Sequence, residues 1–344
     1  MTEVVVRSSA PIRVCDLGGW TDTWFAAHGR VVNFGVAPRV HVVVRSSPSD
    51  GDPAVAVDLR NYGIRFTPSR SPANWGRHAL IEATLHRMGG SPPAHDVEVV
   101  IWSDAPPGAS TGTSASLCVA LIGALDALGE QGSRLSPEEL VAAAHGVETE
   151  LLGLQSGVQD QVCAVHGGVN DVLISPYPHA QRTEIQLEQE VREALDGRLS
   201  LIYLGPHRSS ALHQLVIATL EHHDEEPAAL GDLREAARSG ALALRAGDLA
   251  GFGAAMIHNT MAQRDLHPGL VGARARRVFD LAEQSAALGW KVNGAGGEGG
   301  SLSVLHRDDA SRAEFERVIE SRRGPFRPIP VRLADGLVVT ITLP

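Results

Sequence analysis

One segment of the sequence has the composition of a phosphate-binding loop. Its members are small residues or proline: Pro107, Gly108, Ala109, Ser110, Thr111, Gly112, Thr113, Ser114, Ala115 and Ser116. The segment joins an alternating apolar run at 97–101 to an apolar pattern of helical spacing at 117–128. The free N–H groups and dipole of a helix N-terminus attract anions, and small residues let an anion reach the backbone. We expect a phosphate site here, with an ordinary Ser/Thr-capped turn as the alternative.

Three further segments place charged or polar residues beside glycines. Near the N-terminus, Arg13 precedes Gly18-Gly19-Trp20-Thr21-Asp22. In the middle, Glu148 precedes Gln159-Asp160-Gln161, and near the C-terminus stands Gly294-Ala295-Gly296-Gly297. Phosphoryl transfer needs a carboxylate to accept the proton of a hydroxyl, a cation to neutralise charge, and oxygen ligands for Mg²⁺. The segments contain all of these groups.

The four segments, in this order, resemble the GHMP small-molecule kinase superfamily over nearly the whole chain. Gly-Gly-Trp-Thr-Asp, Gln-Asp-Gln and the sequence Arg208-Ser209-Ser210 are most similar to heptose 7-phosphate kinases and to the kinase part of fucokinases. The resemblance implies an α+β fold of two domains with the active site in the cleft between them. We expect residues 1–195 to form a mixed-sheet α/β domain with five strands and the phosphate loop, and residues 196–344 to form a ferredoxin-like domain.

The resemblance also implies cofactors and roles. ATP and Mg²⁺ are the expected cofactors: residues 107–116 would hold the phosphates, and Ser114 with Glu148 would hold the metal. Asp160 matches the catalytic base, and Arg13 matches the cation that polarises the attacking hydroxyl. The expected substrate-binding residues are Gly18, Gly19, Trp20, Thr21, Asp22, Arg208, Gly294, Ala295, Gly296 and Gly297.

The expected reaction is phosphorylation of the anomeric hydroxyl of a heptose 7-phosphate. The alternatives are a kinase of the fucokinase type that acts on a free monosaccharide, and an inactive regulator that binds sugar and nucleotide. Gly294, Gly296 and Gly299 also form a G-x-G-x-x-G pattern, but residues 301–305 are expected to be a strand, whereas a dinucleotide fingerprint opens a helix. An oxidoreductase is therefore disfavoured.

Several residues keep alternative interpretations. Asp160 could cap a helix, Arg13 could be an exposed cation on a strand, and Glu150 competes with Glu148 for the metal. Two positions depart from the family pattern: Ser110 stands where glycine is usual in the phosphate loop, and Glu298 stands where glycine is usual in the last motif. Glu298 would bring negative charge near phosphate, point away from it, or help to recognise a sugar hydroxyl.

The composition fits a protein that acts on small molecules. The chain has 344 residues, of which 43% are hydrophobic and 20% charged, and its formal net charge is -10, which disfavours a nucleic-acid partner. No apolar run is long enough to cross a bilayer, and no secretion signal is recognisable. The three cysteines are scattered and have no metal-binding spacing, which disfavours both a disulfide framework and a zinc site. We therefore expect a cytoplasmic protein. We also expect either a monomer or a homodimer. Lys291 is the only lysine.

The elements that must position these residues can be outlined from periodicity and breaker residues. The expected strands are 4–6, 31–34, 40–44, 97–101, 167–174, 199–204 and 301–305. A capping box at Ser136 starts a helix to about 152, and a second helix is expected at 310–321. Residues 209–289 should be mostly helical, with breaks at Pro227, Gly240 and 267–269, and 331–342 should return to strand.

Overall fold

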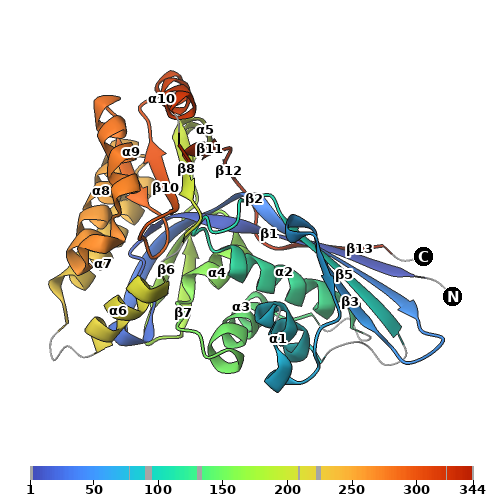
Figure 1. The fold of residues 1–344 in the computed structure, drawn as a ribbon. Helices are drawn as coiled ribbons and strands as arrows, with labels where there is room; N and C mark the ends of the chain where they lie inside the picture. Colours follow the sequence, from blue (N-terminus) through green and yellow to red (C-terminus); the bar gives the residue numbers. More distant parts are fainter. Residues whose placement is uncertain are drawn as a thin grey trace.

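Two β-sheets form the framework of the computed structural model, which describes residues 3–76, 78–89, 95–129, 134–207, 210–221, 226–322 and 324–342 (Figure 1). The larger sheet has nine strands, and its main path runs β13-β1-β2-β5-β3-β4. β12 and β6 also pair with β2, and β7 pairs with β6. All pairs are antiparallel except β3 with β5, so the sheet is mixed, but it exceeds the five strands expected. Its strands are β1 (Val4–Leu17), β2 (Gly29–Pro48), β3 (Val55–Leu59), β4 (Ile64–Phe66), β5 (His95–Ser103), β6 (Val169–Ile174), β7 (Ala180–Glu184), β12 (Arg332–Leu333) and β13 (Val338–Thr342).

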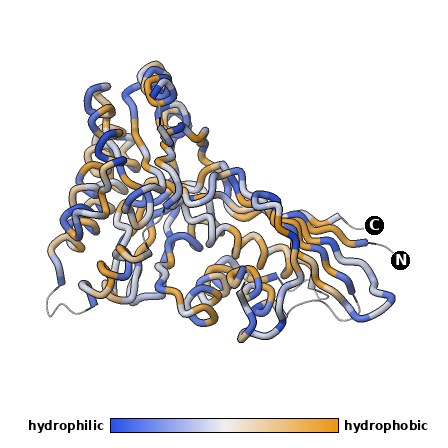
Figure 2. The backbone as a smooth tube through the Cα atoms, viewed as in Figure 1, coloured by the Kyte–Doolittle hydropathy of each residue, from blue (hydrophilic) through white to orange (hydrophobic). Residues whose placement is uncertain are grey.

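Four helices pack together beneath the larger sheet in the view of Figure 1. They are α1 (Ala79–Arg87), α2 (Thr113–Leu128), α3 (Pro137–Gly146) and α4 (Gln159–His166). Apolar residues of β1, β2, β3 and β5 meet those of α1, α2 and α3 in one core. Figure 2 shows hydrophobic colour along the strands of this sheet. This packing fixes the start of α2, where the phosphate loop ends.

The smaller sheet is antiparallel and has the order β11-β8-β10-β9. With helices between β8 and β9 and between β10 and β11, this order is that of a ferredoxin-like fold, as expected. Its strands are β8 (Leu199–Gly205), β9 (Gly289–Val292), β10 (Gly300–Leu305) and β11 (Arg327–Ile329). The associated helices are α5 (Gln189–Arg198), α6 (Ser210–Glu221), α7 (Ala228–Arg245), α8 (Leu249–Leu266), α9 (Ala273–Gln284) and α10 (Asp309–Ser321). None of the described helices is long and apolar enough to cross a membrane.

The chain crosses between the two halves more than once. Its last strands, β12 and β13, pair with β2 and β1, so the larger sheet takes strands from both ends of the sequence. A second apolar core joins residues of β1 and β2 to residues of α7, α8 and β8. The two halves therefore share buried surface, and the ends of their elements can build one site.

Most local expectations are confirmed. Ser136 forms a capping box with Glu139, and Pro227 precedes α7. The helix after Ser136 continues to Leu151 through a π-helical turn, Val147–Leu151. The expected strands 31–34 and 40–44 are parts of one long strand, β2. Short 3₁₀ turns lie at Trp24–Ala26, Arg60–Tyr62, Pro72–Asn74 and Pro268–Leu270.

The expected helix break at Gly240 is wrong. α7 passes through this position without interruption. A Cβ on Gly240 would stand 2.3 Å from Leu17 Cδ1 of β1. The glycine therefore allows α7 to lie close against the larger sheet, and its role is packing.

A similar close approach sets the position of β9, and it yields a stability prediction. A Cβ on Gly253 of α8 would stand 2.3 Å from the carbonyl oxygen of Leu288, whereas Gly231 of α7 has no atom within 4 Å of that position. We expect Gly253→Ala to lower the free energy of unfolding by about 1–3 kcal/mol, because overpacking forces α8 from β9. Gly231→Ala should raise it by about 0.5 kcal/mol through helix propensity. Urea unfolding of both variants checks this, and equal effects would contradict it.

Candidate active site

Two cavities meet at Arg13 and Asp160. The larger, an open cleft of about 620 Å³, is lined by the phosphate loop and by residues of β3, β5 and α1. This volume is in the range of about 300–1,000 Å³ that is typical of small-molecule sites. The smaller, about 170 Å³, is lined by the N-terminal motif and by residues 155–157 and 159–160. Arg13, Asp160, His213, Gly294 and Ala295 line both cavities. A ligand in each cavity would therefore meet the other at the Arg13–Asp160 pair.

The phosphate loop ends at a helix N-terminus that no side chain caps. Gly112 is the N-cap residue of α2, it has a left-handed conformation with φ 68°, and it offers no side-chain hydrogen bond. The structure thus excludes the Ser/Thr-capped turn. Because the first N–H groups of a helix have no partner within the helix, those at the start of α2 are available for an anion. Thr113 and Ser114 line the cleft beside them.

Neighbouring elements hold the loop in place. Ser301 Oγ of β10 donates to the carbonyl of Ala109, at 2.7 Å, and Tyr203 donates to the carbonyl of Pro107, at 3.0 Å. On the other side, the N–H of Arg13 donates to the carbonyl of Thr111, at 2.9 Å. The loop is therefore fixed from both halves of the molecule.

The two departures from the family pattern have different consequences. Ser110 has a left-handed φ of 57°, and its side chain lies against Gly300, so it packs toward the last motif while still lining the cleft. Glu298 points away from the cleft: its exposed side chain accepts the N–H of Ala273, at 2.7 Å, at the start of α9. The negative charge of Glu298 therefore caps a helix.

Arg13 and Asp160 form an ion pair, with 2.7 Å between Arg13 Nε and Asp160 Oδ1. Arg13 is buried in β1, so it is not an exposed edge cation. Asp160 lies in the first turn of α4, where Val158 and not Asp160 is the N-cap residue, and it accepts a hydrogen bond from Arg13 Nε. Arg13 also contacts the buried Asp16, which in turn contacts Lys291 of β9. Burial opposes the charge of Asp16, but Arg13 and Lys291 lower its pKa below the ordinary value.

Asp22 lies at the wall of the smaller cavity and forms no ion pair with any of the described residues. Its carboxylate accepts the backbone N–H and the side-chain amide of Gln159, at 3.1 and 3.3 Å. Burial raises the pKa of Asp22 to about 6, and the charge of Asp160 adds to the rise. Gly157 faces this carboxylate so closely that a Cβ would stand 2.1 Å from Asp22 Oδ2. A hydroxyl that donates to Asp22 would compensate the buried charge.

Glu148 is a second carboxylate without an ion-pair partner among the described residues. Its Oε2 accepts Ser156 Oγ and Gln161 Nε2, both at 2.7 Å. Burial nevertheless raises the pKa of Glu148 to about 7. Glu150, by contrast, is exposed and pairs with Arg87 at 3.0 Å. The donor chemistry of Glu148 and Ser114, a buried carboxylate and a hydroxyl, fits Mg²⁺.

That fit is limited to two protein ligands. The described residues contain no group of three or more His, Cys, Asp or Glu side chains that could hold a metal ion. Magnesium in kinase sites is commonly held by one or two carboxylates together with substrate phosphates and water. Ser114 lines the larger cleft, whereas Glu148 lines neither cavity and is connected to the smaller one by its hydrogen bond from Ser156.

Most of the residues expected from the sequence line one of the two cavities, and eight other described residues line neither. Those at the walls are Arg13, Gly19, Trp20, Asp22, Pro107, Gly108, Ser110, Thr111, Gly112, Thr113, Ser114, Asp160, Gly294 and Ala295. Those that line neither cavity are Gly18, Thr21, Ala109, Ala115, Ser116, Glu148, Gly296 and Gly297. Thr21, for example, donates to the carbonyl of Gly18 at 2.7 Å and stabilises the turn. Arg208 lies outside the described residues.

Sequence reasoning missed three groups of residues. Asn61 and Trp102 line the larger cleft together with aromatic and apolar side chains such as Tyr62 and Leu59. His213 of α6 lines both cavities, and its Nε2 has no hydrogen-bond partner in the part of the chain that the structure describes. Asp16 lies between Arg13 and Gly18 in the sequence and Lys291 lies just before Gly294, but only the fold brings their side chains together.

Comparison with known proteins finds similarity to kinases. Residues 78–168 match the family described as the GHMP kinases N terminal domain. The bifunctional fucokinase/GDP-fucose pyrophosphorylase of Arabidopsis thaliana is 25% identical over 332 residues, which cover 90% of this chain but 30% of that protein. A galactokinase from Roseiflexus sp. (strain RS-1) is 25% identical over 383 residues, covering 97% of this chain and 92% of its own.

Solved structures share the fold over almost the whole chain. A D-glycero-D-manno-heptose 1-phosphate kinase from Bacteriodes thetaiotaomicron has a TM-score of 0.74 at 20% identity, with 97% of this chain and 98% of that chain covered. The mevalonate kinase of Methanococcus jannaschii has a TM-score of 0.73 at 16% identity, with 96% and 98% covered. The chain thus contains a segment, residues 78–168, that matches the GHMP kinases N terminal domain, and its fold follows that of these solved kinases over almost its whole length.

Proposed function

We propose that this protein is an ATP- and Mg²⁺-dependent sugar kinase that phosphorylates the anomeric hydroxyl of a monosaccharide. The observation that supports this most strongly is the position of the Arg13–Asp160 pair, which borders both the cleft with the phosphate loop and the smaller cavity. The nucleotide occupies the larger cleft with its phosphates at the start of α2. The sugar occupies the smaller cavity, where Trp20, Trp24 and Phe25 offer aromatic surface and Asp22 offers a hydroxyl acceptor.

In this mechanism Asp160 accepts the proton of the attacking hydroxyl. Its side chain is 28% exposed, so it can reach a substrate, and Arg13 orients it through Nε. The guanidinium of Arg13 also stabilises the negative charge that the transferred phosphoryl group carries. No covalent intermediate on the protein is required. Mg²⁺, held by Ser114 and Glu148, would neutralise charge on the phosphates.

Two classes of phosphoryl acceptor are each favoured by a different observation. The motifs resemble those of heptose 7-phosphate kinases, and we propose a heptose 7-phosphate as the first acceptor. Its distal phosphate needs a cation, and among the described residues that line the smaller cavity the cation is Arg13, already paired with Asp16 and Asp160. This charge distribution favours the second candidate, a free monosaccharide. The first candidate therefore depends on a cation supplied from elsewhere, for which Arg208 is the proposed residue.

Release of ADP from Mg-ATP tests the function directly. The sugar panel comprises D-glycero-D-manno-heptose 7-phosphate, its stereoisomers, and unphosphorylated fucose, galactose, arabinose and mannose. We expect turnover with one of these classes, and Asp160→Asn should lower kcat by about 10²-fold or more, because the general base is lost.

Binding of Mg-ATP to Asp160→Asn, measured by calorimetry, serves as the control and should be unchanged. Wild-type protein that binds ATP but turns over no sugar would instead favour the inactive regulator.

The buried charge of Asp22 generates a pH-dependent prediction. Because its folded pKa of about 6 lies above the value of about 3.9 in an unfolded chain, its contribution to stability is present below pH 4 and is lost as pH rises through 6. We expect Asp22→Asn to raise the free energy of unfolding at pH 8 by on the order of 2 kcal/mol, with no gain at pH 4, while sugar binding weakens.

Asp171 provides a matched control of opposite sign. Burial opposes its charge, but hydrogen bonds from Arg30 and Arg245 lower its pKa, so Asp171→Asn should destabilise the protein at pH 8. Urea unfolding at both pH values measures each variant. A destabilised Asp22→Asn at pH 8 would show that the Asp22 charge is already compensated.

Variants of Glu148 and Glu150 test which of the two carboxylates binds the metal ion. We expect Glu148→Gln to raise the Mg²⁺ concentration for half-maximal turnover about tenfold or more, because a ligand charge is lost, while Glu150→Gln remains near wild type. Calorimetry should also show that Glu148→Gln loses much of the difference between Mg-ADP and metal-free ADP affinity. Equal behaviour of the two variants would refute the assignment of Glu148.

A further inference from the structure

Arg13 forms ion pairs with two carboxylates. Its Nε lies 2.7 Å from Asp160 Oδ1, and its Nη1 lies 3.1 Å from Asp16 Oδ1. The side chain of Asp16 is 0% exposed and that of Asp160 is 28% exposed. Since charges attract more strongly where water is excluded, Asp16 is the stronger competitor for the guanidinium.

A bulge in β1 creates this competition. Residues three apart on a regular strand point to opposite faces. The pairing of β1 with β2 shifts register between Val14 and Leu17, and Cys15 has a left-handed φ of 54°. The bulge turns Asp16 to the side of Arg13, where the smaller sheet approaches.

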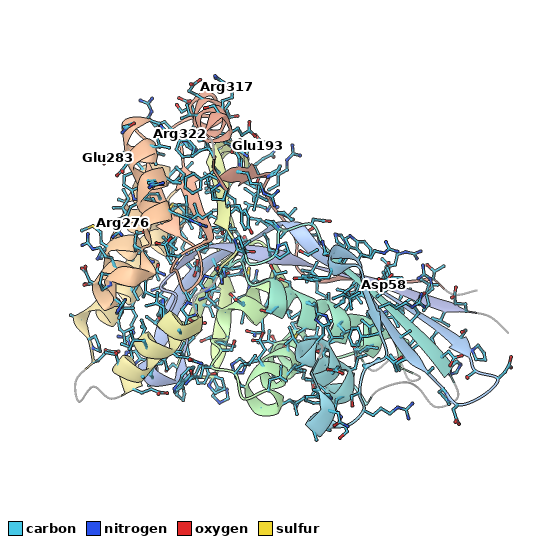
Figure 3. All side chains as sticks on the ribbon, viewed as in Figure 1. Asp58, Glu193, Arg276, Glu283, Arg317 and Arg322 are labelled. Atoms are coloured by element: carbon cyan, nitrogen blue, oxygen red, sulfur yellow. The ribbon has the colours of Figure 1, made fainter. Side chains whose placement is uncertain are left out.

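Lys291 compensates Asp16 from that smaller sheet. Its ammonium lies 3.1 Å from Asp16 Oδ1, and its side chain is 1% exposed. The N–H of Gly294 also donates to Asp16, 3.1 Å from each oxygen. The four groups Arg13, Lys291, Asp16 and Asp160 thus carry two positive and two negative charges. Exposed charged side chains on the half with the smaller sheet include Glu193, Arg276, Glu283, Arg317 and Arg322, which are labelled in Figure 3.

We propose that Lys291 is a positioning residue for phosphoryl transfer: by sharing Asp16, it leaves Arg13 free to hold Asp160 at the junction of the two cavities. The kinetic part of this inference rests on the proposed function. Without the ammonium, two carboxylates would depend on one guanidinium, and the buried Asp16 would draw Arg13 away from Asp160. Lys291 itself lines neither cavity, so it acts through Asp16 and Arg13.

Two variants test the charge balance. Lys291→Met leaves one cation for two carboxylates, and we expect kcat to fall about 20-fold or more with KM for ATP changed less than about threefold, because misplacement of about 1 Å can cost 10²-fold. The double variant Asp16→Asn/Lys291→Met leaves one cation and one carboxylate, and its kcat should return to within about fivefold of wild type. Crystal structures without substrate should show the Arg13–Asp160 ion pair broken in the single variant and intact in the double variant.

The alternatives give different results. A purely structural Lys291 would lower the urea midpoint and leave both kcat of the folded protein and the Arg13–Asp160 ion pair unchanged, which would overturn the proposal. A double variant as slow as the single variant would also overturn it. If Lys291→Met fails to fold, the neutral polar variant Lys291→Gln replaces it: a displaced Arg13 and a kcat loss of about threefold or more support the proposal, and wild-type values refute it. If no sugar is turned over, the proposed function fails, and the crystal structures still decide the role of Lys291.

Discussion

The buried carboxylate of Asp16 is the constraint on which the rest of the site depends. Burying an unpaired carboxylate costs several kcal/mol, so the fold must supply compensating groups. It supplies Arg13 from the same strand and Lys291 and the Gly294 N–H from the other half. Further hydrogen bonds cross between the halves nearby, from Cys15 N to Asn293 and from Gly18 N to Asn259. The contact between the two halves and the placement of Arg13 therefore depend on the same buried carboxylate.

Two other buried carboxylates are treated differently by the fold. Asp22 and Glu148 receive hydrogen bonds but no ion pair among the described residues, and burial raises the pKa of each. Such groups lower the stability of the free protein at neutral pH. In the account given above, a sugar hydroxyl compensates Asp22 and a magnesium ion compensates Glu148. Arg13 and Lys291 thus compensate the charge of Asp16 within the protein. The charges of Asp22 and Glu148 are left for ligands to compensate.

Sequence reasoning could predict what depends on local pattern. The loop before α2, the capping box at Ser136 and the ferredoxin-like order of the C-terminal half follow from composition, periodicity and the family resemblance. The convergence of Arg13 and Asp160, 147 residues apart, could be expected from the resemblance alone.

What the sequence could not reveal depends on tertiary geometry. The bulge at Cys15 cannot be read from a run of buried residues, so the contact of Asp16 with Lys291, 275 residues away, was not predicted. Gly240 was expected to break a helix. Its packing role could not be predicted, because Leu17, the residue that it contacts, is distant in the sequence. Asn61 and Trp102 belong to no motif and become wall residues only when β3, β5 and α1 come together.

A crystal structure with Mg²⁺, a non-hydrolysable ATP analogue and the sugar turned over in the panel tests the central claim most directly. The account predicts that the terminal phosphate and the acceptor hydroxyl meet between Arg13 and Asp160, with the hydroxyl within hydrogen-bond distance of Asp160 and with Asp16 still between Arg13 and Lys291. A sugar bound outside the smaller cavity, or an acceptor hydroxyl beyond the reach of Asp160, would contradict it.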